Sequence, residues 1–429
     1  MDVAIPIILF LAALLLGIPV AWSMAATGII GIYLVTQNVD IVLGVLETVP
    51  YRQGSNYVLT TVPMFVLLGY LLSHARISDD LFAAMAVWSG KSRGGLATAT
   101  VYASAMFGAM SGASVAAASV MSSVAIPPMR KHGYSESLAA GTVAVGATLS
   151  TLIPPSIFLI VYGVATETSI GDLLLAGLVP GLLLAALVAI TIKLWVRFTP
   201  EAAPDGEPTT RNEKLGSLKK VLPSLLLIAL LIGFLYTGLA TPTEVAAVGA
   251  FAALLLGLAM RRLNFASIVS ALRKTARTTA MIFALLIGAT LLGQFLSYAR
   301  VPTKALNAVG SVGMPAWALL SVVALAYLIG CAFMDELPFM LLTLPVTFPL
   351  MISAGFDPVW FGVFSVLLIV IGLIAPPVGL LSFVVSGESG IPLGRVYAGT
   401  SIMIVPVFVL VVAVAVWPEI VTWLPERSR

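Results

Sequence analysis

The segment TLIPPSIFLIVYG, Thr151 to Gly163, is apolar enough for the middle of a membrane, yet it holds two adjacent prolines. Pro154 and Pro155 lack backbone N–H groups, and their rings clash with the preceding turn of a helix. In lipid, a broken helix leaves carbonyl groups without partners, and each unsatisfied polar group costs several kcal/mol. We therefore expect that something in the protein uses the carbonyl oxygens that this break exposes.

The composition predicts a membrane protein with many helical spans. The chain has 429 residues, of which 60% are hydrophobic and only 10% are charged, whereas about 25% of residues are charged in globular domains. Apolar runs of about 20 residues, long enough to cross a bilayer as a helix, recur from end to end. The net charge of +3 does not indicate nucleic-acid binding, and the single cysteine, Cys331, excludes an internal disulfide. We interpret residues 3–21 as a retained first span and not as a cleaved signal.

The apolar runs predict an all-α fold with five spanning helices in each half of the chain. A polar stretch rich in proline, glycine and charge separates the halves, and we interpret residues 199–215 as a cytoplasmic linker. The two predicted domains are therefore residues 1–198 and residues 216–429. The predicted spans are 4–21, 24–37, 57–74, 135–164, 170–196, 216–237, 243–260, 276–298, 358–386 and 393–417.

The two halves share a pattern of glycine and proline that indicates an internal duplication. LLGYLLSHAR, Leu67–Arg76, matches LLGQFLSYAR, Leu291–Arg300, at an offset of 224 positions. From Gly108 onward the offset is 222, and six Gly–Gly or Pro–Pro matches fall within about 70 positions, where chance predicts about one. The matched pairs are Gly108 and Gly330, Pro127 and Pro349, Gly133 and Gly355, Pro154 and Pro376, Pro155 and Pro377, and Gly177 and Gly399.

Each half also contains two short apolar segments that precede the doubled proline. Segments of about 15 residues are short for a full crossing and fit the limbs of a re-entrant hairpin. The first hairpin, 95–129, has limbs 95–110 and 115–129 joined by SGAS, and the second, 315–352, has limbs 315–333 and 337–352 joined around MDEL. Five crossings are an odd number, so the second half is inverted relative to the first. Inverted repeats with broken helices are typical of secondary transporters.

Basic residues gather in one set of predicted loops, while acids such as Asp40, Glu167 and Glu244 mark the other set. The positive-inside rule makes the basic side cytoplasmic, which places both termini in the periplasm. The first hairpin then opens from the cytoplasm and the second from outside. The bases on the cytoplasmic side are Arg76, Lys91, Arg93, Arg130, Lys131, Lys193, Arg197, Arg211, Lys214, Lys219, Lys220, Arg261, Arg262, Arg273, Lys274 and Arg277, whereas Arg300 and Lys304 fall outside.

The inversion brings both breaks and both hairpin tips to the middle of the membrane. Unwound backbone exposes carbonyl oxygens that suit Na⁺, and the N-termini of half-helices attract anions. Ser111 and Ser114 add hydroxyl groups at the first tip. Paired prolines can also simply kink packed helices, and small residues such as those around Ser111 can form a helix interface. Because the pairs occupy equivalent positions after equivalent hairpins, we favour ion sites.

Asp335 and Glu336 are adjacent acids within an apolar stretch. Acids inside a membrane are functional by default, although a solvated cap at a hairpin turn is the alternative. Arg76 and Arg300 fit anchors of helix ends at the interface better than substrate ligands.

The chain contains no metalloprotease motif, phosphate loop or dinucleotide fingerprint. We also find no soluble domain that could couple ATP hydrolysis, so active transport would use an ion gradient. An intramembrane hydrolase based on a serine such as Ser111 lacks a histidine deep in a span to activate it. We therefore expect a transporter and not an enzyme.

These motifs resemble those of a known family. Gly108–Leu183, which includes SGASVAAASVMSSVAIPPMRKHGY and TLIPPSIFLIVYG, is similar to the large membrane subunit of tripartite ATP-independent periplasmic (TRAP) transporters, and so are MDELPFMLLTLPVTFPLM and IGLIAPPVGLLSFVVSG in the second half. The resemblance covers essentially the whole chain. It implies a Na⁺-driven importer of the elevator type in the bacterial inner membrane, with substrates such as C4-dicarboxylates, sugar acids, sialic acids and keto acids.

The resemblance also implies where Na⁺ and substrate bind. The sodium sites of the family lie at the hairpin tips and helix breaks, which map onto Ser111–Ser114 with Ser150–Pro154 and onto Met334–Leu337 with Gly372–Pro376. At Glu336 we would expect an uncharged residue. The Na⁺ ligands so implied are Ser111, Gly112, Ala113, Ser114, Ser150, Thr151, Ile153, Pro154, Met334, Asp335, Gly372, Ile374, Ala375 and Pro376. The implied substrate-binding residues are Ser111, Gly112, Ser114, Pro155, Asp335, Glu336 and Pro377.

The implied partners are a small four-helix membrane subunit and a secreted periplasmic binding protein, and Na⁺ is the coupling ion with no organic cofactor. Because this chain lacks four further N-terminal spans, we expect the small subunit to be a separate polypeptide. The alternative is a stand-alone sodium/dicarboxylate symporter of related architecture that needs no binding protein. Uptake by the reconstituted chain alone would separate the two.

The placement of the breaks predicts which parts of the chain move. We expect residues 95–164 and 315–386 to slide as one rigid body against the remaining helices and to carry substrate and Na⁺ across. The breaks should persist throughout the cycle, because proline cannot rejoin the hydrogen-bond ladder of a helix.

Overall fold

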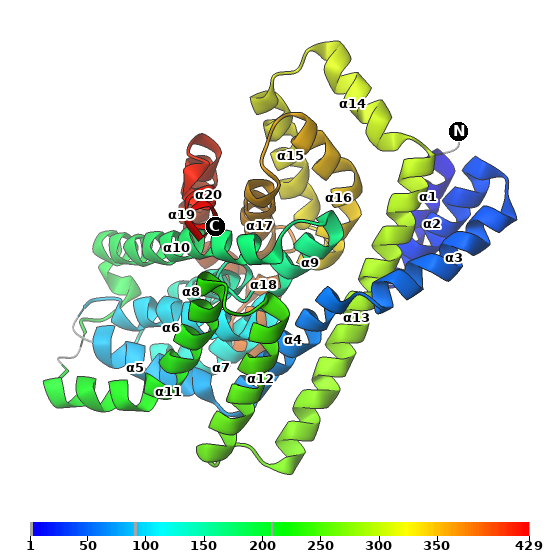
Figure 1. Cartoon of the computed structure of the whole chain (residues 1–429). Helices are drawn as coiled ribbons and strands as arrows, with labels where there is room; N and C mark the ends of the chain where they lie inside the picture. Colours follow the sequence, from blue (N-terminus) through cyan, green and yellow to red (C-terminus); the bar gives the residue numbers. More distant parts are fainter. Residues whose placement is uncertain (1–2, 90–91, 207–208, 429) are drawn as a thin grey trace.

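The computed structural model describes residues 3–89, 92–206 and 209–428. Lys91, one of the predicted cytoplasmic bases, and two positions of the predicted linker lie outside these residues. The described part consists of twenty α-helices and three short 3₁₀ segments, with no β-strand among the described residues. Seven of these helices are long and apolar enough to cross a membrane. The predicted all-α fold with many spans is therefore confirmed (Figure 1).

The first half contains ten α-helices with two interruptions at points that the sequence predicts. A re-entrant hairpin is formed by α6 and α7, and the predicted span 135–164 is broken between α8 and α9. The helices are α1 (Ala4–Leu15), α2 (Val20–Thr36), α3 (Val39–Gly54), α4 (Thr61–His74), α5 (Ile77–Ser89), α6 (Gly95–Ser111), α7 (Ser114–Lys131), α8 (Glu136–Thr148), α9 (Ile157–Thr166) and α10 (Ile170–Phe198).

The second half repeats this order. At offsets of 222 to 224, α4 corresponds to the end of α13, the hairpin α6–α7 to α15–α16, and the broken span α8–α9 to α17–α18. The helices are α11 (Arg211–Thr237), α12 (Pro242–Ala259), α13 (Phe265–Tyr298), α14 (Val301–Val312), α15 (Ala316–Cys331), α16 (Glu336–Ser353), α17 (Pro358–Ile374), α18 (Leu380–Ser389), α19 (Leu393–Val416) and α20 (Glu419–Ser428). The predicted duplication is thus present in the helices themselves.

Several predicted boundaries are wrong, and charged residues explain most of the errors. The predicted span 276–298 extends back to Phe265, so it includes Arg273 and Lys274, because lysine and arginine are good helix formers although they are not apolar. The helices α3, α5, α14 and α20 were not predicted as separate elements. The predicted span 4–21 ends at Leu15, where Gly17 takes a positive φ of 77° before Pro19.

The predicted linker 199–215 is partly helical. A short 3₁₀ segment covers Pro200–Ala202, and α11 already begins at Arg211. The side chain of Thr210 accepts a hydrogen bond from the backbone N–H of Glu213, whose carboxylate accepts one from the N–H of Thr210. This capping box satisfies two backbone donors and starts the helix earlier than the apolar pattern indicates.

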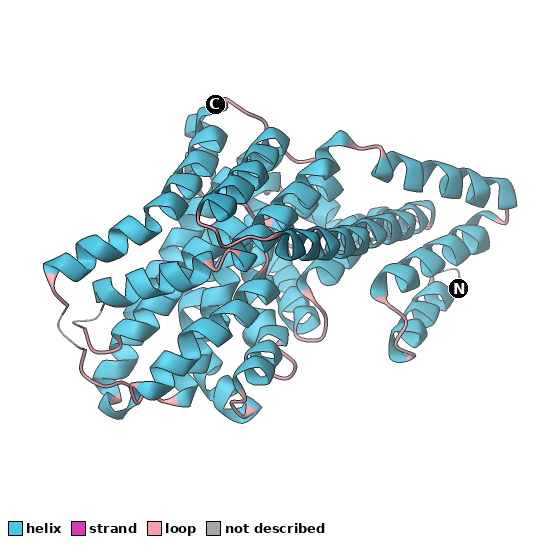
Figure 2. Ribbon diagram, turned by 90° about the horizontal axis from the view of Figure 1, so that it is seen from below, coloured by secondary structure: helices cyan, strands magenta, loops and turns pink. Residues whose placement is uncertain are grey.

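The helices pack in two groups. In the outer group α2 lies along α13 and α12 lies along α4, and α13 runs along the length of one side of the molecule (Figure 1). In the inner group α8 lies along α19, where Gly141 and Gly399 allow the two backbones to meet. The N-terminal helices project from one side of the bundle (Figures 1 and 2).

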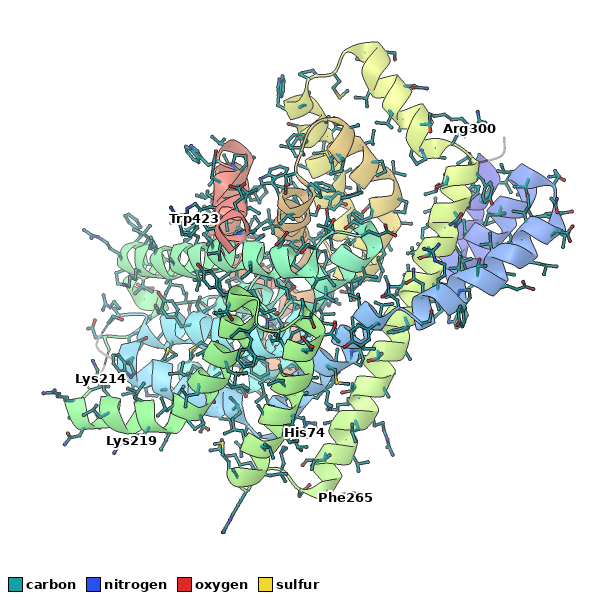
Figure 3. The ribbon with its side chains drawn as sticks, in the orientation of Figure 1. His74, Lys214, Lys219, Phe265, Arg300 and Trp423 are labelled. Atoms are coloured by element: carbon teal, nitrogen blue, oxygen red, sulfur yellow. The ribbon has the colours of Figure 1, made fainter. Side chains whose placement is uncertain are left out.

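The long helix α13 relates the predicted loops to the two ends of the molecule. Phe265 begins α13 and lies at one end, together with Lys214 and Lys219, whereas Arg300 follows α13 and lies at the other end (Figure 3). The sequence predicts these two ends to be cytoplasmic and periplasmic, respectively. That sidedness remains a prediction from the positive-inside rule.

Candidate functional site

The tip of the first hairpin is a connection of two residues that lies against the first helix break. Helix α6 ends at Ser111, Gly112 takes a left-handed φ of 62°, and α7 begins at Ser114. A Cβ on residue 112 would lie 2.6 Å from the carbonyl oxygen of Pro155. Glycine is therefore required both for the backbone conformation and for the close approach.

The first break contains several hydroxyl groups that bond to backbone carbonyls. The Ser156 hydroxyl donates to the carbonyl of Thr151 at 2.6 Å, and the Thr151 hydroxyl donates to that of Thr148 at 2.7 Å. The backbone N–H of Ile157 donates to the carbonyl of Gly112 at 3.3 Å, which joins the break to the hairpin tip. The Pro154–Pro155 peptide bond is cis. Some of the backbone carbonyls that the prolines leave without a helical partner thus accept hydrogen bonds within the break. Each carbonyl oxygen keeps a second lone pair that is able to bind an ion.

The second hairpin tip is longer and carries the two acids. Helix α15 ends at Cys331, and Asp335 caps α16 by accepting the backbone N–H of Glu336 at 2.8 Å. A Cβ on Gly372 would lie 2.8 Å from the carbonyl carbon of Cys331, so α15 and α17 approach closely beside the tip. The tip therefore lies near the end of α17, where the second break begins.

The second break resembles the first in backbone conformation, but its prolines differ in solvent exposure. The Pro376–Pro377 bond is also cis, and Ser382 donates its hydroxyl to the carbonyl of Ile374 at 3.0 Å. The Tyr397 hydroxyl reaches the carbonyl oxygens of Pro377 and Val378, at 2.9 and 2.6 Å. Pro376 and Pro377 are exposed, whereas Pro154 and Pro155 are buried.

The two tips meet through one hydrogen bond. The Ser114 hydroxyl donates to Oε1 of Glu336 at 2.8 Å, and both side chains are buried. Residues 114 and 336 differ by 222 positions, the offset of the repeat, so the bond joins equivalent residues of the two halves. A contact between equivalent residues is expected on the axis that relates two repeats. It places the meeting point of the tips at the centre of the duplicated fold.

Two buried polar atoms of the hairpin tips have no protein partner among the described residues. These are Oε2 of Glu336, on a side chain that is 9% exposed, and the hydroxyl of Ser111, which is 4% exposed. Buried polar groups are usually hydrogen-bonded, so each of these two atoms is able to bind an ion, a ligand or a water molecule at the tips. Glu336 is therefore not the solvated cap that the sequence left as an alternative, whereas Asp335 is a partly exposed cap.

The structure brings most of the predicted site residues to the two tips and the first break. Ser111–Ser114 lie against the segment Ser150–Pro155, and Cys331, three residues before Met334, lies beside Gly372. Pro377 is exposed and bonded through its carbonyl to Tyr397, a residue that sequence reasoning missed because no motif contains it. Gly69 of α4 was also missed, although a Cβ there would lie 2.9 Å from Cα of Ser111.

The donor atoms suit Na⁺ better than a transition metal. Among the described residues there is no group of three or more His, Cys, Asp or Glu side chains that could hold a metal. Carbonyl and hydroxyl oxygens are instead plentiful at the tips and breaks, and such hard oxygen ligands bind Na⁺ where helices are interrupted. The residues present therefore fit the predicted coupling ion.

A cavity lies between α7, the second limb of the first hairpin, and the outer helices α4 and α5. It has a volume of about 700 Å³, and its wall is formed by residues of α4, α5 and α7 and of the turn between α4 and α5. The lining residues include Ser73, Arg76 and Asp79 on one side and Val120 and Ser123 on the other. The cavity therefore lies along the boundary between the two helix groups and not at the hairpin tip.

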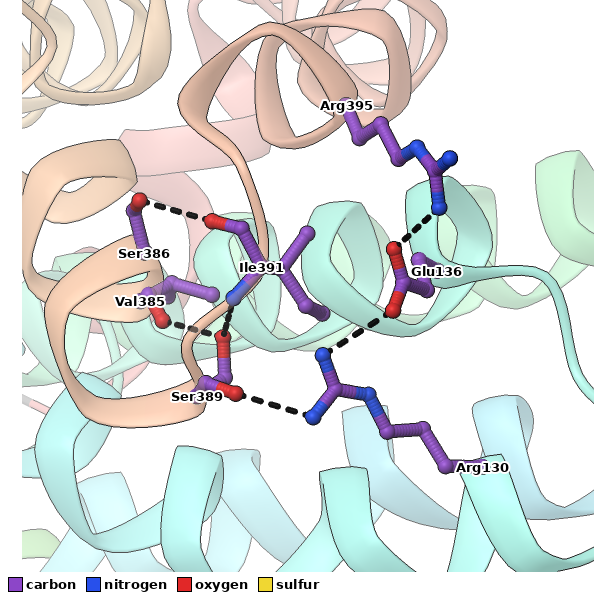
Figure 4. Close-up of polar contacts among 7 residues, drawn as sticks. All are labelled: Arg130, Glu136, Val385, Ser386, Ser389, Ile391 and Arg395. Carbon is purple, nitrogen blue, oxygen red and sulfur yellow. Dashed lines mark hydrogen bonds and ion pairs between the residues drawn. The ribbon is translucent and has the colours of Figure 1, made fainter.

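Polar contacts tie the far end of the first hairpin to the second half of the chain. Arg130 donates to the carboxylate of Glu136 at 3.0 Å and to the carbonyl of Ser389 at 2.9 Å, and Arg395 pairs with the same carboxylate at 2.5 Å (Figure 4). Nearby, Ser119 donates to Glu388 at 2.7 Å. These contacts link α7, α8, α18 and α19.

Comparison with known proteins identifies the family. Residues 7–420 match the family model described as the DctM component of the tripartite ATP-independent periplasmic transporter. The chain belongs to this family. The DctM match covers both hairpins, both breaks and nearly all of the described helices, so the predicted resemblance to TRAP large subunits is confirmed.

Relatives of this chain in the DctM family are named after different substrates. The chain is 35% identical to the C4-dicarboxylate TRAP transporter large permease of Pseudomonas aeruginosa, over 84% of this chain and 85% of that protein. It is 33% identical to the sialic acid TRAP transporter large permease of Vibrio cholerae, over 86% and 87%. It is 31% identical to the ectoine/5-hydroxyectoine TRAP transporter large permease of Ruegeria pomeroyi, over 86% of both chains.

The fold also matches a solved structure, the YdaH transporter of Alcanivorax borkumensis. The TM-score is 0.64 at 15% sequence identity, and the match covers 88% of this chain and 89% of the other. At this identity the match concerns the fold alone. This DctM chain is thus the large membrane component of a bacterial TRAP transporter, with a polytopic transporter fold.

Proposed function

We propose that this chain imports a small organic acid across the bacterial inner membrane, driven by Na⁺ and by an elevator motion. It would receive the substrate from a periplasmic binding protein and would assemble with a separate small membrane subunit. Membership of the DctM family is established, whereas Na⁺ coupling, the motion and the separate partners are proposals.

The observation that carries the proposal is the meeting of two hairpin tips beside two helix breaks at the centre of the fold. The first Na⁺ would bind among the oxygens of Ser111–Ser114 and Ser150–Pro154, and the second among those of Met334, Asp335 and Gly372–Pro376. The substrate would bind between them, next to Glu336. The unpartnered hydroxyl of Ser111 and carboxylate oxygen of Glu336 support this placement.

The packing suggests which helices move together. Side-chain hydrogen bonds join Tyr162 to Pro358 and Trp360 to Val414 inside the inner group, in addition to the contacts of Figure 4. We define the inner group, α6–α10 with α15–α20, as the transport module. The rigid body predicted from the sequence, residues 95–164 and 315–386, did not include α10 or α19. We include both in the module, because Gly177 of α10 packs on the backbone of Leu152 in the first break and Gly399 of α19 packs on α8.

The outer helices form a separately tied group, α1–α5 with α11–α14, which we define as the scaffold. Within it, Thr61 bonds to Thr243 at 2.6 Å, Gln53 to Thr290 at 2.8 Å, and Arg262 pairs with Asp80. These bonds join the two halves of the chain inside the scaffold. A scaffold held together by these hydrogen bonds and this ion pair can remain fixed while the module slides.

The position of the module relative to the scaffold is asymmetric, as an elevator requires. Helix α5 packs along α6 and has five buried residues, whereas its counterpart α14 has no buried residue. In Figure 1 α14 lies at the rim of the molecule, and it packs along α16. Together with the predicted sidedness, this asymmetry supports an arrangement in which the module lies toward the cytoplasm.

Reconstitution tests the proposal. The chain is placed in proteoliposomes with the small subunit and binding protein encoded beside it, and uptake of the ligand that the binding protein retains is measured. We expect uptake with an inward Na⁺ gradient and none when choline replaces Na⁺. Undiminished uptake on a proton gradient without Na⁺ would refute the coupling, and equal uptake by the chain alone would favour the stand-alone symporter.

A further inference from the structure

Glu336 brings a carboxylate to the point where the hairpin tips meet. We propose that this carboxylate recognises a cationic group of the substrate, so that the transported solute is a small carboxylate that also carries an ammonium or amidinium group. The inference rests on the proposed function, because it specifies which class of organic acid the central site accepts.

The geometry leaves one oxygen of Glu336 free for a ligand. The residue is the first of α16, is 9% exposed, and accepts the Ser114 hydroxyl on Oε1. Its Oε2 is buried and has no partner among the described residues. A buried carboxylate that accepts a single hydrogen bond is unfavourable in its charged form, so a positive group beside Oε2 would stabilise it.

The first hairpin tip also holds a second polar group that is able to bind a ligand. The hydroxyl of Ser111 is buried, with 4% of the residue exposed, and also has no partner among the described residues. A hydroxyl can donate to a substrate carboxylate or accept from an ammonium N–H. The tips therefore offer one anion and one hydroxyl to whatever binds between them.

The tips offer no basic side chain to bind a second negative charge. Residues 315–386, which contain the second hairpin and break, have no lysine, arginine or histidine. Within residues 95–164 the bases are confined to Arg130, Lys131 and His132. Arg130 lies sixteen residues beyond Ser114, about 24 Å along α7, and is bonded to Glu136 and Ser389.

The charges of the site then favour a zwitterion over a dianion. Two Na⁺ ions at the proposed sites would balance the charges of Asp335 and Glu336. A dicarboxylate would add two further negative charges without compensation, next to a carboxylate in a low-dielectric site where repulsion is strong. A carboxylate that also carries a cation adds no net charge and supplies the donor that Oε2 lacks.

Matched pairs of small molecules test the inference. The purified chain is unfolded by heat, followed through the fluorescence of its seven tryptophans, in sodium or choline chloride. One pair is 4-aminobutyrate against succinate, and the other is ectoine, a cyclic amidinium carboxylate, against cyclohexanecarboxylate. We expect at least one zwitterion to stabilise the chain at a half-saturating concentration about tenfold lower than its matched anion, a difference of about 1.4 kcal/mol.

Variants assign the preference to one side chain. Glu336→Gln should abolish the preference, and Glu336→Asp should retain it because the charge remains. Glu388→Gln is the matched control: Glu388 also accepts a serine hydroxyl, from Ser119 at 2.7 Å, but in an exposed contact away from the tips. That variant should keep the preference for the zwitterion unchanged.

Several results would overturn the inference: anions that stabilise the chain as well as the zwitterions, no stabilisation by either zwitterion, or a preference that survives Glu336→Gln. Its failure can be told apart from failure of the proposed function. A preference for anions that requires Na⁺ would leave the Na⁺-coupled function standing. A Glu336-dependent preference for zwitterions that is equal in choline would support this inference and refute Na⁺ coupling.

Discussion

Replacing Gly112 by alanine tests whether the first hairpin tip really rests on the first break. The substitution acts in two ways. An alanine must adopt the left-handed φ of 62° at this position, and its methyl group would lie 2.6 Å from the carbonyl oxygen of Pro155. Ordinary contacts of a Cβ begin near 3.4 Å, so the tip or the break must shift.

The two effects can be separated by a control at Gly133. That residue also has a positive φ, 79°, but a Cβ there would meet no atom within 4 Å. The left-handed conformation costs a residue with a Cβ about 1–2 kcal/mol, and overpacking typically adds about 1–3 kcal/mol. We therefore expect Gly133→Ala to lose about 1–2 kcal/mol of stability and Gly112→Ala about 2–5 kcal/mol.

The assay is thermal unfolding of the two variants in detergent, followed by a titration of uptake with Na⁺. Gly112→Ala should unfold at a clearly lower temperature than Gly133→Ala and should need more Na⁺ for half-maximal uptake, because the displaced break carries the proposed carbonyl ligands. If the two variants match each other in both measurements, the tip does not rest on the break in the working protein.

Three further predictions concern the same site. Ser114→Ala leaves Oε1 of Glu336 buried without its donor and should lower the free energy of unfolding by about 1.5–3 kcal/mol. Ser119→Ala removes a hydroxyl that bonds to the exposed Glu388 and should lower it by less than about 1 kcal/mol. Equal unfolding midpoints for the two variants would contradict the buried bond. Asp335→Asn should keep α16 capped, because asparagine caps as well as aspartate, yet raise the Na⁺ concentration for half-maximal uptake; unchanged Na⁺ dependence would remove Asp335 from the ion site. Uptake should rise with Na⁺ with a Hill coefficient above one, and strictly hyperbolic dependence in a full titration would argue against two coupled sites.

The positions of the breaks and tips could be predicted because glycine and proline mark them directly. Pro154–Pro155 and Pro376–Pro377 stand out in apolar surroundings, and their spacing of 222 repeats. The hairpin limbs follow from their short apolar length, and the observed helices begin and end within a few residues of those bounds. Such signals are local, so they survive without knowledge of the packing.

Features that depend on packing could not be predicted. The sequence places Asp335 and Glu336 side by side, but only the fold determines that Glu336 turns inward to Ser114 while Asp335 caps its helix. The different exposure of the two proline pairs has the same origin. The repeats are similar in sequence, so this asymmetry comes from how the two halves pack and not from the local residues.

The helices that the sequence did not predict carry charged or polar residues that interrupt their apolar runs. Helix α5 has Asp79 and Asp80 in its first turn, and α14 has no buried residue at all. Neither resembles a membrane span by hydropathy. Both immediately precede a hairpin, so these two of the four missed helices lie at the boundary across which the module is proposed to slide.

The most direct test of the elevator is a disulfide across that boundary. A Cβ at Gly293, on α13 of the scaffold, would lie 3.7 Å from Cβ of Pro345, on α16 of the module, which is close to the mean Cβ separation of about 3.8 Å in disulfides. The control joins Gly257 to Ala75 within the scaffold, where the corresponding distance is 3.5 Å. The native Cys331 is buried and can remain.

Both cysteine pairs are introduced, oxidised, and assayed for Na⁺-driven uptake in proteoliposomes, with reductant added to reverse the bond. We predict that the oxidised pair at Gly293 and Pro345 blocks uptake and that reduction restores it, whereas the oxidised scaffold pair transports at nearly the uncrosslinked rate. If the boundary disulfide forms completely and uptake continues at the full rate, the module does not slide, and local gating at the hairpins would replace the elevator.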